Sequence, residues 1–183
     1  MRIIAGEKKG LHLLGPSKKD KTRPSLDQIK EAVFNVLQPI KENAFVLDLF
    51  AGTGQIGLEF LSRGAGHCVF VEKSPKMAAI LRQNIEITKY EDRTKVYLGD
   101  FRTNLKKISD SFDYIYLDPP YYFNYEKKTF EFISSKEKLN PGGIVILEAA
   151  IDDHFSEEME AFEMIFKRKY NYQCIRIYKE IGE

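Results

Sequence analysis

The chain of 183 residues carries a formal net charge of +1 and is 43% hydrophobic, which suits one domain with a substantial buried core. Its two cysteines have no CxxC spacing and its three histidines are scattered, which argues against a disulfide framework and a metal site. No apolar run approaches the roughly 18 residues of a membrane span, and the first residues lack the apolar core of a signal peptide, so we expect a cytoplasmic protein.

Positive charge is concentrated at the amino terminus. Residues 1–24 hold seven Lys or Arg residues and two acidic residues, so a basic extension precedes a slightly acidic body. Within it, the stretch from Arg2 to Leu14 mixes short apolar pairs with glycines, which predicts a small hairpin. The extension is either a solvated terminus or a contact for nucleic-acid phosphates, and its charge does not choose between them.

A helix is predicted from Leu26 to Leu37. Ser25 and Gln28 have the spacing of a capping box, and apolar residues then recur at helical intervals. The opposite face is polar, and we interpret it as a solvated surface. It carries Asp27, Lys30, Glu31 and Asn35.

From residue 44 onward, apolar strand-like runs alternate with helix-length segments, which is the pattern of βαβ units. The predicted strands are 45–50, 68–72, 95–98, 114–117 and 144–148, and the predicted helices are 55–63, 75–88 and 125–138. Ser74 is the expected cap of the second of these helices, with Pro75 at its first position. A turn is predicted at 141–143, and a closing antiparallel hairpin is predicted from 162–167 and 172–178. We therefore expect a doubly wound α/β fold with a mostly parallel sheet of seven strands.

A glycine-rich loop follows the first predicted strand, where an open α/β sheet binds a nucleotide cofactor. Gly52, Gly54 and Gly57 fit the dinucleotide fingerprint. Glu72 lies where a ribose-binding carboxylate is expected, so an NAD-linked enzyme is one interpretation. Asp48 favours an enzyme that binds S-adenosylmethionine. A carboxylate beside the loop repels a pyrophosphate and attracts the cationic sulfonium and amino groups of that cofactor.

The third predicted strand adds two further candidates. Asp100 can accept a hydrogen bond from an adenine NH2 group while Phe101 packs against the ring, although Asp100 could instead cap a helix that starts at Phe101. The predicted cofactor-binding residues are Asp48, Phe50, Gly52, Gly54, Glu72, Asp100 and Phe101.

The fourth predicted strand ends in Asp118-Pro119-Pro120-Tyr121, which predicts a docking site for an exocyclic amine. The Asp118 carboxylate and the Pro119 carbonyl can each accept one N–H, and Tyr121 can stack on the base that carries the amine. The two prolines remove two N–H donors, so the turn presents acceptors. The predicted catalytic residues are Asp118, Pro119 and Tyr121.

Taken together, these motifs resemble the bacterial 16S ribosomal RNA guanine-N2 methyltransferase family. The resemblance covers 2–6 with Lys9-Gly10, 23–35, 48–57 with 61–65, and 118–121. It implies a Rossmann-like class I methyltransferase, S-adenosylmethionine as cofactor, and a guanine of 16S rRNA in the small subunit or its assembly intermediate as substrate. In the 23–35 segment, Leu26, Gln28 and Lys30 replace residues that are usual in the family.

The resemblance also implies candidate RNA contacts, namely Lys9, Arg23, Asp27 and Glu31. We expect a monomer with a single domain over 1–183, made of an extension over 1–24 and a catalytic core over 25–183 with a capping helix over 26–37. Three alternatives stay open. They are a DNA adenine or cytosine amino-methyltransferase, an NAD-binding oxidoreductase and a non-catalytic RNA-binding module.

Overall fold

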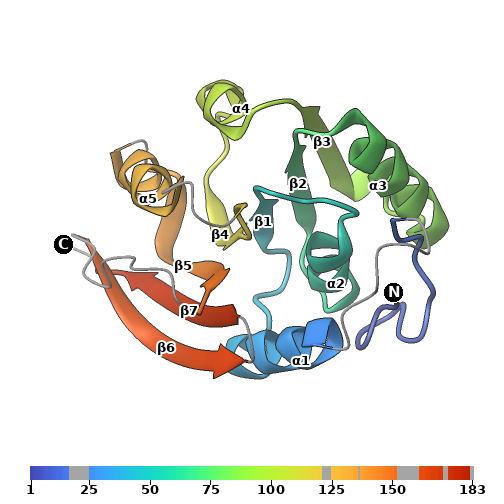
Figure 1. Cartoon of the computed structure of the whole chain (residues 1–183), viewed down its shortest axis with the longest axis horizontal. Helices are drawn as coiled ribbons and strands as arrows, with labels where there is room; N and C mark the ends of the chain where they lie inside the picture. The colour runs from blue at the N-terminus through green and yellow to red at the C-terminus, as the bar shows by residue number, and fades with distance from the viewer. Residues whose placement is uncertain (17–24, 121–124, 136, 152–160, 171–172, 182–183) are drawn as a thin grey trace.

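A computed structural model describes residues 1–16, 25–120, 125–135, 137–151, 161–170 and 173–181. Within these residues, seven strands form one sheet in the order β3-β2-β1-β4-β5-β7-β6 (Figure 1). The strands are β1 (Phe45–Asp48), β2 (His67–Glu72), β3 (Thr94–Leu98), β4 (Phe112–Leu117), β5 (Leu139–Ala150), β6 (Phe162–Tyr170) and β7 (Gln173–Glu180). Strands β1 to β5 are parallel, whereas β7 runs antiparallel to both β5 and β6. The predicted mostly parallel sheet with a closing hairpin is therefore confirmed.

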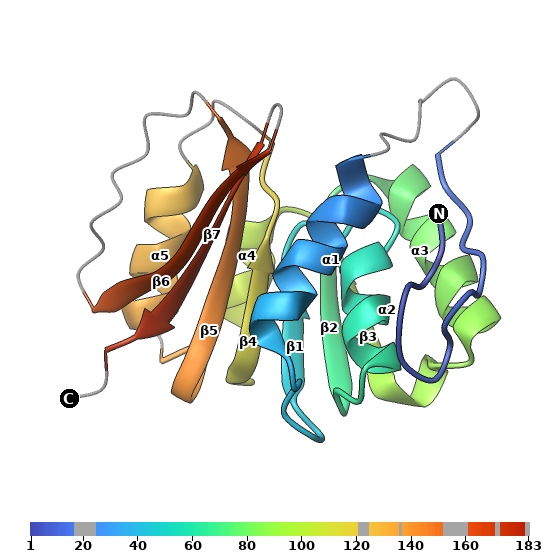
Figure 2. The ribbon, with the colours of Figure 1, turned by 90° about the horizontal axis from the view of Figure 1, so that it is seen from below.

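Helices cover both faces of the sheet (Figure 2). They are α1 (Ser25–Leu37), α2 (Gln55–Ser62), α3 (Pro75–Thr88), α4 (Phe101–Lys107) and α5 (Tyr125–Ser135). Helices α1, α2 and α3 pack on one face, where the Phe60 ring contacts those of both Phe34 and Tyr114. Helices α4 and α5 pack on the other face, where Phe101 and Phe130 share a core with the apolar side of β4 and β5. Every residue of β4 is buried, as expected for a central strand covered on both sides.

Local sequence signals account for most element boundaries. Ser74 caps α3 by accepting a hydrogen bond from the backbone N–H of Met77 at 3.4 Å, as predicted, with Pro75 at the first helical position. The predicted turn at 141–143 instead lies inside β5, where the pairing with β4 jumps and Gly142 has φ 76°. The two glycines let the strand continue through an irregularity, so the prediction of a separate turn was wrong.

Residues 1–16 pack against the helices. A single antiparallel bridge joins Arg2 to His12, and Ile3 and Leu13 are buried. The buried carboxylate of Glu59 on α2 accepts hydrogen bonds from the backbone N–H groups of Ile4 at 2.9 Å and Ala5 at 3.0 Å. The solvated-terminus interpretation is therefore wrong for residues 1–16. The remainder of the predicted extension lies outside the described residues.

The polar face of α1 is partly covered, which corrects the prediction of a solvated surface. Lys30 is fully buried, because the amino-terminal segment lies over it. Its Nζ atom donates to the carbonyl of Arg2 at 2.7 Å and lies 3.7 Å from Oε2 of Glu59. Glu31 and Asn35 are exposed, as expected. None of the helices described combines the length and apolar character that a membrane span requires.

Candidate functional site

Two pockets open where the strand order reverses. Strands β1 and β4 are neighbours, and the connections that follow them lead to opposite faces of the sheet, which is where open α/β sheets bind ligands. A cavity of about 330 Å³ lies toward α1 and one of about 350 Å³ lies toward α4. We call them the α1-side pocket and the α4-side pocket. Phe50 and Asp118 line both, so the two pockets meet at these residues.

The glycine loop between β1 and α2 leaves room beside the α1-side pocket. Gly52 has φ 54°, and a Cβ atom there would meet no heavy atom within 4 Å, so it would project into open space. Gly54 has φ 80°, and a Cβ atom there would approach Cδ1 of Leu81 to 2.2 Å. The missing side chain of Gly52 therefore leaves space for a ligand. The missing side chain of Gly54 instead permits the loop to pack closely on α3.

Asp48 is a buried carboxylate at the end of β1. Its Oδ2 atom accepts a hydrogen bond from the backbone N–H of Gly57 at 3.1 Å. Burial raises the pKa of Asp48 to about 7, against the lowering effect of that hydrogen bond, and the negative charge of Glu72 raises it further. A cation that entered this pocket would stabilise the ionised form, because little in its surroundings offsets the cost of burial.

Glu72 is held by the backbone at the end of β2. Its Oε2 atom accepts from the N–H of Gly52 at 2.7 Å, and Oε1 accepts from the N–H of Ser74 at 2.6 Å. A carboxylate oxygen has a second lone pair, so Glu72 can still accept hydrogen bonds from ligand hydroxyls in the α4-side pocket that it lines.

Asp100 caps α4, which was the alternative role predicted for this residue. Its Oδ1 atom accepts from the backbone N–H of Arg102 at 3.0 Å, and its carboxylate pairs with the Arg102 guanidinium at 2.8 and 2.9 Å. These bonds to Arg102 hold the pKa of Asp100 below its usual range. Asp100 still lines the α4-side pocket beside Phe101, whose ring lies 5.0 Å from that of Phe50. The two rings provide an apolar wall for a flat guest.

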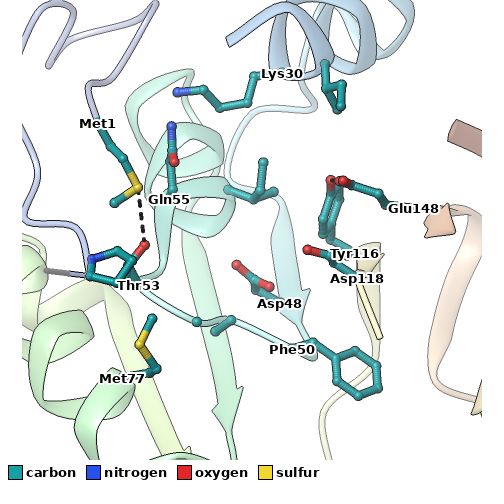
Figure 3. A pocket seen from close by; sticks show the side chains of 15 residues that line it. Met1, Lys30, Asp48, Phe50, Thr53, Gln55, Met77, Tyr116, Asp118 and Glu148 are labelled. Atoms are coloured by element: carbon teal, nitrogen blue, oxygen red, sulfur yellow. Dashed lines mark hydrogen bonds between the residues drawn. The ribbon is translucent and has the colours of Figure 1, made fainter. Parts of the chain in front are cut away.

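The turn predicted to dock an amine starts at Asp118, which lines both pockets. Asp118 is exposed and Pro119 is buried. Figure 3 shows the Asp118 side chain entering the α1-side pocket next to Tyr116 and facing Asp48. Tyr121 lies outside the described residues. The structure therefore brings Asp118 together with Asp48, Phe50 and Gly52, which lie far from it in the chain.

The lining of the α1-side pocket includes residues that were not predicted as site residues. The polar ones among them include Lys30, Gln55, Tyr116 and Glu148. Tyr116 and Glu148 sit within apolar runs that predict strands, and Lys30 was placed on a solvated face. The signal that could have revealed Glu148 is a single carboxylate at the carboxyl end of an otherwise apolar parallel strand.

The two predicted RNA contacts whose side chains the structure describes, Lys9 and Glu31, do not line the pockets. Lys9 is exposed on the turn over residues 6–10, which is anchored at the carboxyl end of α2 by a hydrogen bond from the N–H of Glu7 to the carbonyl of Ser62. The pocket lies at the amino end of that helix. Glu31 is exposed on α1, while Arg23 and the side chain of Asp27 lie outside what the structure describes.

The comparisons with known proteins agree with this geometry. The family model described as "Conserved hypothetical protein 95" matches residues 1–179. The Bacillus subtilis protein YlbH is 33% identical over 185 residues, and the alignment covers 100% of both chains. "Ribosomal RNA small subunit methyltransferase D" of Haemophilus influenzae is 30% identical over 155 residues, covering 83% of this chain and 80% of the relative.

A solved structure, that of the Escherichia coli protein yhhF, superposes with a TM-score of 0.89 at 24% identity. The superposition covers 100% of this chain and 99% of the other. With the strand order described above, it shows that the chain has the Rossmann-like class I methyltransferase fold. The fold prediction is confirmed.

The residues present fit S-adenosylmethionine. Asp48 would face the cationic methionine end of the cofactor, Gly52 would leave space for it, Glu72 would hold the ribose, and the wall formed by Phe50 and Phe101 would pack on the adenine. The negative charge of Glu72 raises the pKa of Asp48, and two such neighbouring carboxylates suit a cation better than a pyrophosphate.

Proposed function

The chain belongs to the Conserved hypothetical protein 95 family, and from that premise we propose that it is an S-adenosylmethionine-dependent methyltransferase that modifies the N2 amine of a guanine in 16S ribosomal RNA. The rRNA assignment is supported by relatives named as ribosomal RNA small subunit methyltransferase D. We further propose that the 183 residues act as a single domain and as a monomer, on the small subunit or its assembly intermediate.

The observation that carries this proposal is the position of Asp118. It lines both pockets, so an acceptor amine bound to it would lie beside a cofactor that spans them. S-adenosylmethionine supplies, when bound, a methyl group on a cationic sulfur. The chain itself has to place a weak nucleophile in line with that methyl group.

Asp118 and the carbonyl of Pro119 perform this placement in the proposed mechanism. The lone pair of an exocyclic amine is delocalised into the base. When both N–H groups donate to fixed acceptors, the nitrogen is held in a more pyramidal form with its lone pair directed at the methyl group. Alignment of this kind can contribute roughly 7–11 kcal/mol to lowering a barrier. The amine loses one proton after transfer, and exposed Asp118 can pass that proton to water.

Binding of the base requires the target nucleotide to leave its stacked position and enter the α1-side pocket. Tyr121 is proposed to stack on the base, a contact typically worth about 1–3 kcal/mol. Phe50 lines both this pocket and the α4-side pocket, and the base and the adenine of the cofactor would occupy opposite sides of it.

Nucleoside mass spectrometry of 16S rRNA tests the proposed function. RNA from cells that lack the gene should contain one N2-methylguanosine fewer than RNA from the parent strain. Purified protein and S-adenosylmethionine should restore the nucleoside when they are added to small subunits from the deletion strain. An unchanged N2-methylguanosine content in the deletion strain would rule the assignment out.

A further inference from the structure

The amine-docking turn does not by itself identify the base. Guanine, adenine and cytosine each carry an exocyclic amine whose two N–H groups could donate to Asp118 and Pro119. The bases differ at the ring nitrogen beside the amine. Guanine has an N1–H donor there, whereas adenine N1 and cytosine N3 are acceptors. A group in the pocket that contacts this ring nitrogen would therefore decide which base is methylated.

Glu148 is placed to be that group. The sheet register pairs Asp48 with Tyr116, and pairs Tyr116 with Ile146, two residues before Glu148. Because side chains alternate along a strand, Asp48, Tyr116 and Glu148 share one face at the carboxyl edge of the sheet. All three line the α1-side pocket, and Figure 3 shows Glu148 at the hydroxyl end of Tyr116, on the same side of the pocket as Asp118.

Tyr116 fixes the orientation of the Glu148 carboxylate. The Tyr116 hydroxyl donates to Oε2 of Glu148 at 2.6 Å, and both residues are at least 97% buried. Burial and the nearby charge of Glu148 raise the pKa of Tyr116 well above its usual value, so its hydroxyl remains a donor. A carboxylate has about four lone-pair sites, so this bond leaves acceptor capacity for a guest in the pocket.

Gln55 indicates that the guest of the α1-side pocket is polar. Its side chain is 5% exposed, and among the described residues neither its amide nitrogen nor its amide oxygen has a hydrogen-bond partner. Figure 3 shows it on the wall opposite Glu148. Buried polar side chains are nearly always hydrogen-bonded, so an unpaired amide at a pocket wall favours a ligand with donors and acceptors.

We propose that Glu148 selects guanine by accepting the N1–H of the base while Asp118 and Pro119 hold the amine, with Tyr116 as the positioning residue. This role rests on the proposed function. Adenine or cytosine in the same pose would turn a ring lone pair toward the carboxylate, and the repulsion would exclude them. A site that accepts a hydrogen bond from a ligand N–H group discriminates strongly against an analogue that lacks this group. An apolar pocket discriminates far less between ligands that differ only in size.

Small subunits that carry 2-aminopurine in place of the target guanine test this role. This analogue keeps the 2-amine but has an acceptor at N1. Wild-type protein should methylate guanine-bearing subunits with a kcat/KM at least about 100-fold higher than that for the analogue. Glu148→Gln, whose amide can also donate, should lower this ratio at least about tenfold with an unchanged affinity for S-adenosylmethionine. Tyr116→Phe should lower the ratio less, and Glu131→Gln on the exposed face of α5 should leave it unchanged.

The outcomes separate the two claims. If the wild-type protein does not methylate guanine-bearing subunits, the proposed function itself fails and this role fails with it. If it methylates them but the ratio stays the same in Glu148→Gln, only the role of Glu148 is overturned. Equal wild-type rates on the two substrates would overturn the role even if Glu148→Gln did not fold.

Discussion

Asp118 has to act on the acceptor amine and not on the cofactor if the mechanism holds. Asp118→Ala should lower kcat by about 10²–10³-fold or more, because one acceptor that aligns the amine is lost. Its affinity for S-adenosylmethionine, measured by titration calorimetry, should stay within about threefold of wild type. The matched control is Asp110→Asn. It also changes a carboxylate, but one that precedes the amino-terminal end of β4, whereas Asp118 follows the carboxyl end of that strand. Wild-type turnover in Asp118→Ala would exclude the mechanism.

Asp48 makes cofactor binding depend on pH. Its pKa of about 7 means that the carboxylate is largely protonated at pH 6, and a neutral acid gives up the attraction to a cation. The Kd for S-adenosylmethionine should therefore rise as the pH falls through 7, by up to about tenfold per pH unit. Calorimetry between pH 6 and pH 8.5 measures this dependence, and Asp48→Asn should flatten it. A pH-independent Kd in the wild type would contradict the role of Asp48.

The same group lowers the stability of the cofactor-free protein at higher pH. Between 3.8, its ordinary pKa, and about 7, the folded protein keeps a proton on Asp48 that the unfolded chain has lost. Stability therefore falls as the pH rises through this window, and the loss is complete above pH 7. Asp48→Asn should raise the free energy of unfolding at pH 8, by up to about 4 kcal/mol, as measured by urea denaturation. The difference should shrink at pH 4.

Some of the residues that line the two pockets could be predicted from the sequence, and others could not. Asp48, Glu72 and Asp118 were found because each follows an apolar run at the end of a parallel strand, a position that the chain order alone specifies. Lys30 was misplaced because helical spacing says which residues share a face but not which distant segment covers it. Glu148 was missed because its neighbours on β1 and β4 are known only from the sheet register.

The amino-terminal segment depends on one carboxylate of α2. Glu59 accepts two backbone N–H groups of that segment, pairs with Arg63 at 2.8 Å and lies near the buried ammonium of Lys30. Glu59→Ala should lower the free energy of unfolding by about 3–5 kcal/mol, because it leaves a buried charge uncompensated. Urea denaturation measures the loss. Glu86→Ala, at an exposed position on α3, should stay within about 0.5 kcal/mol of wild type.

A substitution in the turn over residues 6–10 tests whether the basic extension contacts RNA. Lys9→Ala should weaken binding to small subunits and lower the slope of log K against log salt concentration by about one, because one phosphate contact is lost. Lys107→Ala, at the exposed end of α4 on the other face of the sheet, should leave the slope unchanged. A slope in Lys9→Ala equal to that of the wild type would show that Lys9 is not a phosphate contact.

The order of elements and most of their boundaries were predictable from sequence, but the packing of the extension was not. The alternation of strands and helices is a local pattern, so the parallel sheet and the hairpin of β6 and β7 followed from it. The docking of residues 1–16 on α2 and α3 depends on contacts more than 50 positions apart in the chain, such as that between Ile4 and Glu59. No local pattern encodes such contacts.

The complete protein should be stabilised by the correct cofactor, because the proposed site joins residues from β1, β2, β4 and the loops between them. S-adenosylmethionine at about 100 times its Kd should add about 2.7 kcal/mol. For a chain of this length, that corresponds to a rise in Tm of roughly 5–10 °C in a thermal-shift assay. NAD at the same concentration should leave Tm unchanged. A rise with NAD alone would favour an oxidoreductase.

Asn84 on α3 joins two parts of the chain that the sequence keeps far apart. Its Oδ1 atom accepts from the N–H of Leu14 at 2.7 Å, and its Nδ2 atom donates to the carbonyls of Leu14 at 3.0 Å and Thr53 at 2.9 Å. Leu14 lies near the end of the docked segment over residues 1–16, and Thr53 lies between Gly52 and Gly54 of the loop. A protease that gains access to one of these segments should therefore gain access to the other, since a shared amide makes them open as one cooperative unit.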